Sequence, residues 1–111
     1  MKLEFRLRGW KNNASLRHLV EHQLVRLADL AAISTAEVVL VRTPAATPAW
    51  TARAHLQVPG PDLRAEARDH TVEAAWRKVL AALHSEIDRR LERRRRRFDD
   101  RRRLRPAGRS T

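Results

Sequence analysis

The 111-residue sequence has no cysteine and no tyrosine, and it contains only two phenylalanines. Without cysteine the chain can form no disulfide, thiol nucleophile or thiolate metal site, and this usage fits a reducing compartment. The scarcity of aromatic rings argues against a surface that works by stacking on the bases of a single strand. No glycine-rich phosphate loop, Ser/His/Asp arrangement or carboxylate pair stands out. We therefore expect a non-enzymatic protein with no cofactor, no metal and no small-molecule substrate.

Long hydrophobic runs are also absent. No apolar segment approaches membrane-spanning length, and the first ten residues alternate in character instead of forming a signal-peptide core. The length suits one domain around one small core. We expect a cytoplasmic protein that does not contact membranes.

The positive charge is concentrated near the end of the chain. The net charge is +11, with 24 Lys/Arg against 13 Asp/Glu. Residues 1–88 hold twelve basic and ten acidic residues, whereas residues 89–105, the arginine run, hold eleven arginines and three acids. Arginine presents a planar fork that suits phosphate. The pattern predicts a nearly balanced domain with a cationic arm that binds nucleic acid.

Four segments have the pattern of strands. Residues 2–8, 51–58 and 63–68 alternate apolar with polar side chains, which is typical of half-buried strands. Residues 37–42 contain a Val-Val-Leu-Val run, which also favours a strand. Proline- and glycine-containing loops separate the last three strands.

Two further segments have helical periodicity. In residues 16–31, which Asn13 could cap, the expected apolar face is Leu16, Leu19, Val20, Leu24, Leu27 and Leu30. In residues 68–97, with Thr71 as the expected N-cap, the apolar face is Val72, Trp76, Val79, Leu80, Leu83 and Ile87. We expect the first half of this long helix to anchor in the core and the second half to project beyond it.

The predicted fold is α+β, in the order β-α-β-β-β-α. Strands with one apolar face allow helices to cover only one side of the sheet, so we predict a two-layer sandwich. We divide the chain into an α+β domain, residues 1–95, and an arginine-rich C-terminal tail, residues 96–111. The open sheet face would carry Lys2, Arg6, Arg8, Arg53, His55, Arg64 and Arg68.

This element order, the strand at Val38–Val41, the strand at Ala52–Val58 and the segment AEARDHTVEAAWRKVLAALHSEIDR resemble the ribosome hibernation-promoting factors and ribosome-associated translation inhibitors. The resemblance covers roughly residues 1–95. Thr71 departs from the acidic cap usual in the family, and Glu73 stands where an aromatic residue is common. Longer members carry an added dimerisation domain, so this chain looks like a short form.

The resemblance implies a stress-response translation regulator that binds ribosomal RNA of the small subunit near the decoding region and inactivates or protects idle ribosomes. The expected RNA contacts are basic residues of the last helix and of the sheet face. They are Arg77, Lys78, Arg89, Arg90, Arg93, Arg94, Arg95, Arg96 and Arg97, supported by Arg53, Arg64 and Arg68. Arg93–Arg97 cannot share one helix face, and their repulsion predicts that the arm orders fully only against RNA.

Other interpretations remain open. The arginine run could be a solvated tail, and the sheet-face cations could be the polar residues that any half-exposed sheet carries. The chain could be a double-stranded RNA-binding or RNA-chaperone module, or a protein-interaction domain whose sheet face self-associates.

Two smaller motifs involve histidine and tryptophan residues. His18, Glu21 and His22 form an H-x-x-E-H pattern that could hold zinc, but a catalytic zinc needs a third protein ligand and a closed cleft. The pattern of the last helix places Trp76 in the core. Trp10 and Trp50 flank turns and could pack at the edge of the domain or contact RNA.

Overall fold

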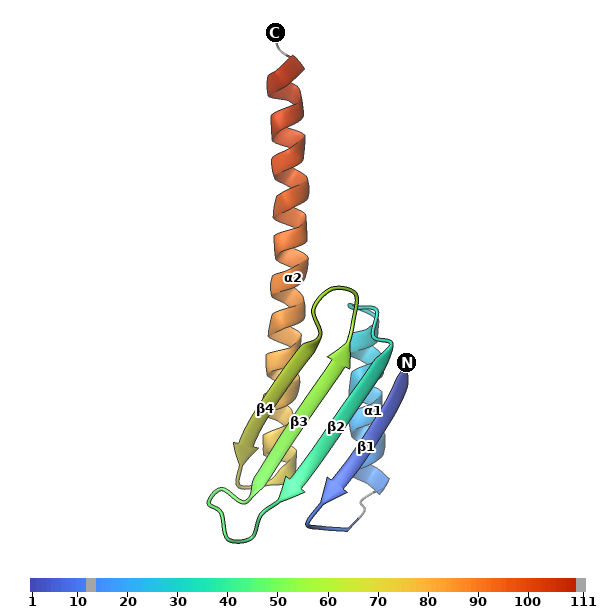
Figure 1. Cartoon of the computed structure of the whole chain (residues 1–111), viewed down its shortest axis with the longest axis vertical. Coiled ribbons are helices and arrows are strands. Elements are labelled where there is room, and N and C mark those ends of the chain that lie inside the picture. The colour runs from blue at the N-terminus through green and yellow to red at the C-terminus, as the bar shows by residue number, and fades with distance from the viewer. Residues whose placement is uncertain (12–13, 110–111) are drawn as a thin grey trace.

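The computed structural model describes residues 1–11 and 14–109, with side chains up to residue 99. Asn13, the expected cap of the first helix, lies outside the described residues. The element order confirms the predicted β-α-β-β-β-α succession (Figure 1). The elements are β1 Lys2–Arg8, α1 Ala14–Ala28, β2 Thr35–Arg42, β3 Trp50–Gln57, β4 Leu63–Asp69 and α2 Val72–Arg109.

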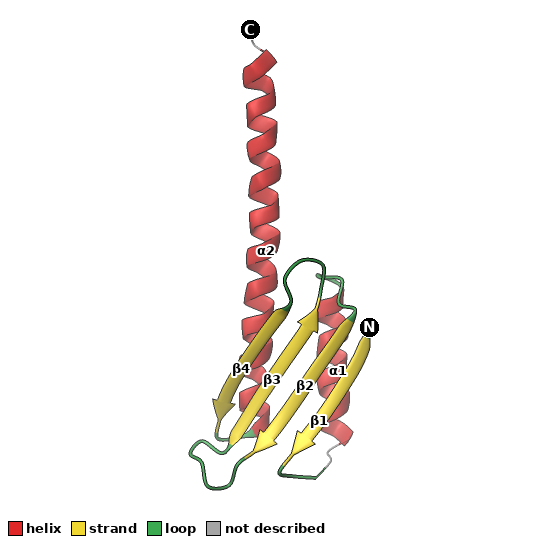
Figure 2. Cartoon of the chain, in the orientation of Figure 1, coloured by secondary structure: helices red, strands yellow, loops and turns green. Residues whose placement is uncertain are grey.

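The sheet has the strand order β1-β2-β3-β4. β1 pairs with β2 in parallel because α1 makes the crossover between them. β2–β3 and β3–β4 are antiparallel pairs joined by the loops at residues 43–49 and 58–62. Both helices lie on one face of this sheet and leave the other open, as Figure 2 shows. The predicted two-layer α+β architecture is confirmed.

The core lies between the sheet and the two helices. Every second residue of the central strands points into it, and the registers align these positions across β2, β3 and β4. They are Ala36, Val38 and Leu40 in β2, Ala52, Ala54 and Leu56 in β3, and Leu63 in β4. The alternation in residues 51–58 and 63–68 therefore predicted the correct inward face of β3 and β4.

α2 begins with the predicted cap. The backbone N–H of Ala74 donates to the Thr71 hydroxyl at 3.1 Å, which satisfies one of the helix's free amides. The predicted stripe is buried from Val72 to Ile87, apart from the half-buried Leu80, and it includes the fully enclosed Trp76. No residue of α2 beyond Ile87 is buried in the part whose side chains are described.

We call residues 88–109 of α2 the arm. The structure continues the helix through Arg109. That the arm orders fully only against RNA stays a prediction. Arginine is a good helix former, and Glu86 and Glu92 pair with arginines one turn later, so these contacts offset the repulsion. The chain therefore passes from the domain into residues 96–109 without a break in the backbone.

Some expected core positions differ. Leu19 and Leu30 are 45% and 44% exposed, although the sequence placed both on the buried face. α1 ends at Ala28, before Leu30, and its buried stripe is narrower than predicted: Leu16, Val20, Leu24 and Leu27. Thr51 was expected to face solvent but is buried on the open sheet face, where it lies between Val41 and Arg68 in the register.

Candidate nucleic-acid interface

The arm projects well past the two-layer domain. A helix rises about 1.5 Å per residue, so its 22 residues extend roughly 33 Å. This accounts for the elongated shape of the molecule, whose principal extents are 69, 28 and 18 Å. Figure 1 shows the arm leaving the sheet at the end where β3 turns into β4. The arrangement holds a row of cations away from the domain surface.

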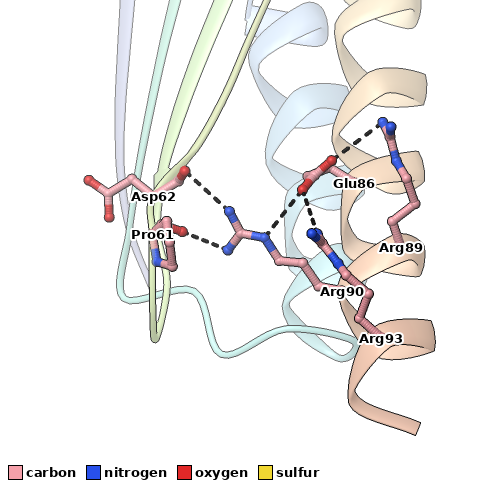
Figure 3. A network of polar contacts seen from close by, with 6 residues as sticks. All are labelled: Pro61, Asp62, Glu86, Arg89, Arg90 and Arg93. Atoms are coloured by element: carbon pink, nitrogen blue, oxygen red, sulfur yellow. Dashed lines mark hydrogen bonds and ion pairs between the residues drawn. The ribbon is translucent and has the colours of Figure 1, made fainter. Parts of the chain in front are cut away.

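Glu86 is the main acidic partner at the base of the arm. Its Oε2 lies 3.3 Å from Arg89 Nη2, and its Oε1 lies 3.5 Å from Arg90 Nε and 3.3 Å from Arg93 Nη2 (Figure 3). The spacings of three, four and seven residues place these side chains on neighbouring turns. One carboxylate therefore holds three of the predicted RNA contacts, a role that was not predicted from the sequence.

Arg90 also reaches the turn between β3 and β4. Its Nη1 donates to the Pro61 carbonyl at 2.6 Å and its Nη2 to the Asp62 carbonyl at 3.4 Å (Figure 3). The Arg90 side chain is only 27% exposed. The structure therefore gives this guanidinium a tethering contact in addition to its predicted place in the interface.

The other arginines of the arm differ in their contacts. Arg96 Nη2 lies 3.6 Å from Glu92 Oε1 on the preceding turn. Among the described residues, Arg94, Arg95 and Arg97 have no ion pair and no side-chain hydrogen bond. Guanidiniums that have no acidic partner within the described part of the chain suit phosphate binding with release of bound salt ions.

A groove of about 440 Å³ separates the β3–β4 turn from the arm. One wall is the turn, and the other is a single face of the helix. The lining residues are Pro59, Gly60, Pro61, Glu86, Arg90, Arg93, Arg94 and Arg97. Four arginines and one carboxylate thus face the same space, so it is strongly cationic.

The open sheet face is more balanced than predicted. Arg53, Arg64 and Arg68 lie on it, but the registers place Glu37 and Glu66 on the same face. Arg53 Nε donates to Glu66 Oε1 at 3.0 Å, and His55 Nε2 lies 2.7 Å from Asp62 Oδ2. A shallow hollow of about 550 Å³ lies over this face. The alternation in residues 63–68 already placed Glu66 at an outward position.

Arg77 and Lys78 lie near the start of α2, away from the arm. Lys78 Nζ is 2.9 Å from Asp69 Oδ2 and donates to the Arg68 carbonyl at 3.4 Å. The His70 backbone N–H, which donates to Asp69 at 2.7 Å, and the Lys78 ammonium hold the pKa of Asp69 below its ordinary value of 3.8. The predicted contacts thus occupy three surfaces: the arm, the open sheet face and the first turns of α2.

The remaining motifs are the tryptophans at the turns and the histidine pair of α1. Trp10 and Trp50 pack edge to face with ring centres 5.0 Å apart, and the Trp10 indole donates to the Leu40 carbonyl at 3.1 Å. His18 and His22 are exposed on α1. In the described parts of the chain, no group of three His, Cys, Asp or Glu residues could hold a metal ion.

Over the described residues, none of the helices is long and apolar enough to cross a bilayer.

Comparison with known proteins gives one family and a set of similar folds. Residues 3–95 match the family described as Sigma 54 modulation protein / S30EA ribosomal protein. The N-terminal domain of Protein Y from Thermus thermophilus is 23% identical, with a TM-score of 0.68 over 80% of this chain and 98% of that one. A ribosomal subunit interface protein from Coxiella burnetii is 18% identical, with a TM-score of 0.71 over 83% and 99%. No curated protein sequence matches the chain.

Proposed function

This chain belongs to the sigma-54 modulation protein / S30EA ribosomal protein family, and we propose that it regulates translation by binding the small ribosomal subunit. It would dock near the decoding region, where messenger and transfer RNA otherwise lie. Binding there inactivates or protects idle ribosomes under stress by occupancy, with no chemical step. Such a protein works in the cytoplasm with the ribosomes.

The observation that carries the proposal is the separation of charge from core. The domain buries its apolar residues up to Ile87, and the net charge of residues 1–88 is only +2. Among the described residues of the arm beyond it, Arg94, Arg95 and Arg97 have no protein counter-ion. A rigid cationic helix on a nearly neutral platform suits a channel lined with phosphate, because binding there releases condensed counter-ions.

The proposed contacts are those predicted from the sequence. Arm arginines make the primary contacts, while the first turns of α2 and the sheet face support them. In this proposal residues 1–95 form the docking domain and residues 96–111 the arginine-rich extension. The contact set is Arg77, Lys78, Arg89, Arg90 and Arg93–Arg97, with Arg53, Arg64 and Arg68 in support.

The test is ribosome co-sedimentation of a variant with Arg93–Arg97 changed to glutamine. We expect binding to be lost at moderate salt, while the melting temperature moves by less than about 4 °C, because these side chains are exposed. Changing the same five residues to lysine keeps the charge and is the matched control. Retained co-sedimentation of the glutamine variant would refute the arm's role.

The alternative is a double-stranded RNA-binding or RNA-chaperone module. If the alternative is correct, any RNA duplex should bind the chain as well as small subunits do and should compete with them for it. Saturable binding of one chain per small subunit, resistant to excess duplex, would exclude the alternative.

A further inference from the structure

The groove between the β3–β4 turn and the arm presents cations on one side of a single helix. Arg90, Arg93, Arg94 and Arg97 are spaced by three, four and seven residues, which brings them to one face. Arg95 stands on the opposite side of the same helix and does not line the groove. The groove is therefore defined by where its arginines stand on the helix as well as by how many there are.

The facing wall is built from backbone and small rings. Pro59, Gly60 and Pro61 form it, and Gly60 has open space around the position where a Cβ would stand. Arg90 fixes this wall to the helix through the Pro61 carbonyl at 2.6 Å. The groove is therefore held open at a defined width, with no large side chain closing it from the turn.

Among the described residues that line the groove, Glu86 is the only acid. It holds Arg93 Nη2 at 3.3 Å and Arg90 Nε at 3.5 Å, and its side chain is 34% exposed. Arg90 has two carbonyl acceptors besides Glu86, whereas Arg93 has Glu86 alone among the described residues. An incoming anion can therefore take Arg93 from Glu86 without releasing the turn.

We propose that this groove binds the phosphodiester backbone of one RNA strand, and that Glu86 is a built-in competitor that occupies Arg93 until a phosphate replaces it. The inference rests on the proposed ribosomal function and assigns that function a defined strand-binding site. Arg93, Arg94 and Arg97 contact the phosphates. Glu86 is a positioning residue. It lowers the affinity of the groove for RNA and reduces the binding of weak anions.

A strand fits the groove better than a free anion does. The groove has a volume of about 440 Å³ and is bounded by the turn on one side and the helix on the other. Arg93 and Arg97, which contact the phosphates, stand four residues apart, about 6 Å along the helix axis. This spacing suits neighbouring phosphates of one strand.

The test measures anisotropy of a short fluorescein-labelled polyuridine RNA against the full chain over a series of salt concentrations. Each groove variant has a control with the same charge change on the opposite side of the arm. Glu86→Gln is matched by Glu92→Gln, and Arg94→Ala is matched by Arg95→Ala. Thermal melting of every variant separates binding from folding.

We expect Glu86→Gln to raise RNA affinity about three- to tenfold, with Glu92→Gln changing it less than about twofold. We expect Arg94→Ala to weaken binding and reduce the salt slope by about one, with a clearly smaller change for Arg95→Ala. Replacing chloride by inorganic phosphate at equal ionic strength should leave the affinity unchanged.

Three results would overturn the groove. The first is an equal change in RNA affinity within each matched pair, and the second is weaker RNA binding by the Glu86→Gln variant. The third is displacement of the RNA by inorganic phosphate, which would make the groove a site for the free ion. Co-sedimentation of the wild-type chain with small subunits is measured in parallel. Failure of the matched pairs with ribosome binding intact removes only the groove, whereas loss of ribosome binding removes the proposed function.

Discussion

Trp76 and Gln23 join the two helices behind the sheet. The Trp76 indole N–H donates to the Gln23 side-chain oxygen at 2.6 Å, and the Trp76 ring is otherwise enclosed in the core. A buried indole needs such an acceptor, because an unsatisfied N–H in the core is unfavourable. The bond therefore links α2 to α1 within the helical layer.

Removing the indole in two steps should separate this bond from the packing. We expect Trp76→Phe to lower the free energy of unfolding by about 1–2 kcal/mol, mainly through the lost hydrogen bond. Trp76→Ala also leaves a cavity and should lower it by about 3–5 kcal/mol. Urea denaturation followed by circular dichroism measures both. Equal losses for the two variants would show that the ring contributes little packing energy.

The Arg90 tether should matter for stability as well as for binding. Arg90→Ala removes the contacts to the Pro61 and Asp62 carbonyls and frees Glu86 from one partner. We expect a loss of about 1–2 kcal/mol in the free energy of unfolding. Arg95→Ala, which removes the same charge from an exposed site, should change it by less than about 0.5 kcal/mol. Identical urea midpoints for the two variants would contradict the tether.

The depressed pKa of Asp69 predicts a pH dependence. The ionised carboxylate is stabilised in the folded chain by the His70 N–H and by Lys78. Its contribution is therefore present above the unfolded pKa and is lost as pH falls below 3.8 toward the lower folded pKa. Asp69→Asn should make the melting temperature less sensitive to pH in this acidic range. Parallel melting curves of wild type and variant against pH would argue against the interaction.

The fold was predictable from the sequence because each element follows a local pattern. Alternation gave the strands, and the spacing of Val72, Trp76 and Ile87 gave the buried face of α2. Leu19 shows the limit of this reasoning. A three- and four-residue pattern defines a broad apolar stripe, but only the packed sheet decides which edge of that stripe is covered.

The residue types of the candidate site could be predicted from the sequence, but the contacts between these residues could not. The Arg90 tether depends on carbonyls 28 and 29 residues earlier in the chain, which no local pattern identifies. The role of Glu86 had a local signal, since arginines follow it at three, four and seven residues. The role of Glu86 was nevertheless not predicted, because the arginine run was interpreted only as a set of RNA contacts.

Two glycines with the same backbone geometry should respond differently to a side chain. Gly9 and Gly60 have φ values of +80° and +85°, in the left-handed region that disfavours other residues. A Cβ on Gly60 would meet nothing within 4 Å, whereas a Cβ on Gly9 would collide with the Arg42 carbonyl oxygen. That carbonyl belongs to the end of β2, beside β1 in the sheet, and cannot move without disturbing the strand pairing.

We therefore expect Gly60→Ala to lower the free energy of unfolding by about 1–2 kcal/mol, the strain of the left-handed backbone alone. Gly9→Ala adds a backbone collision and should lower it by at least about twice as much. Urea denaturation of both variants provides the comparison, with Gly60→Ala as the control for backbone strain. If the two variants lose the same stability, the close approach of Gly9 to Arg42 is not a constraint on the fold. The pair then reports only the cost of a positive φ.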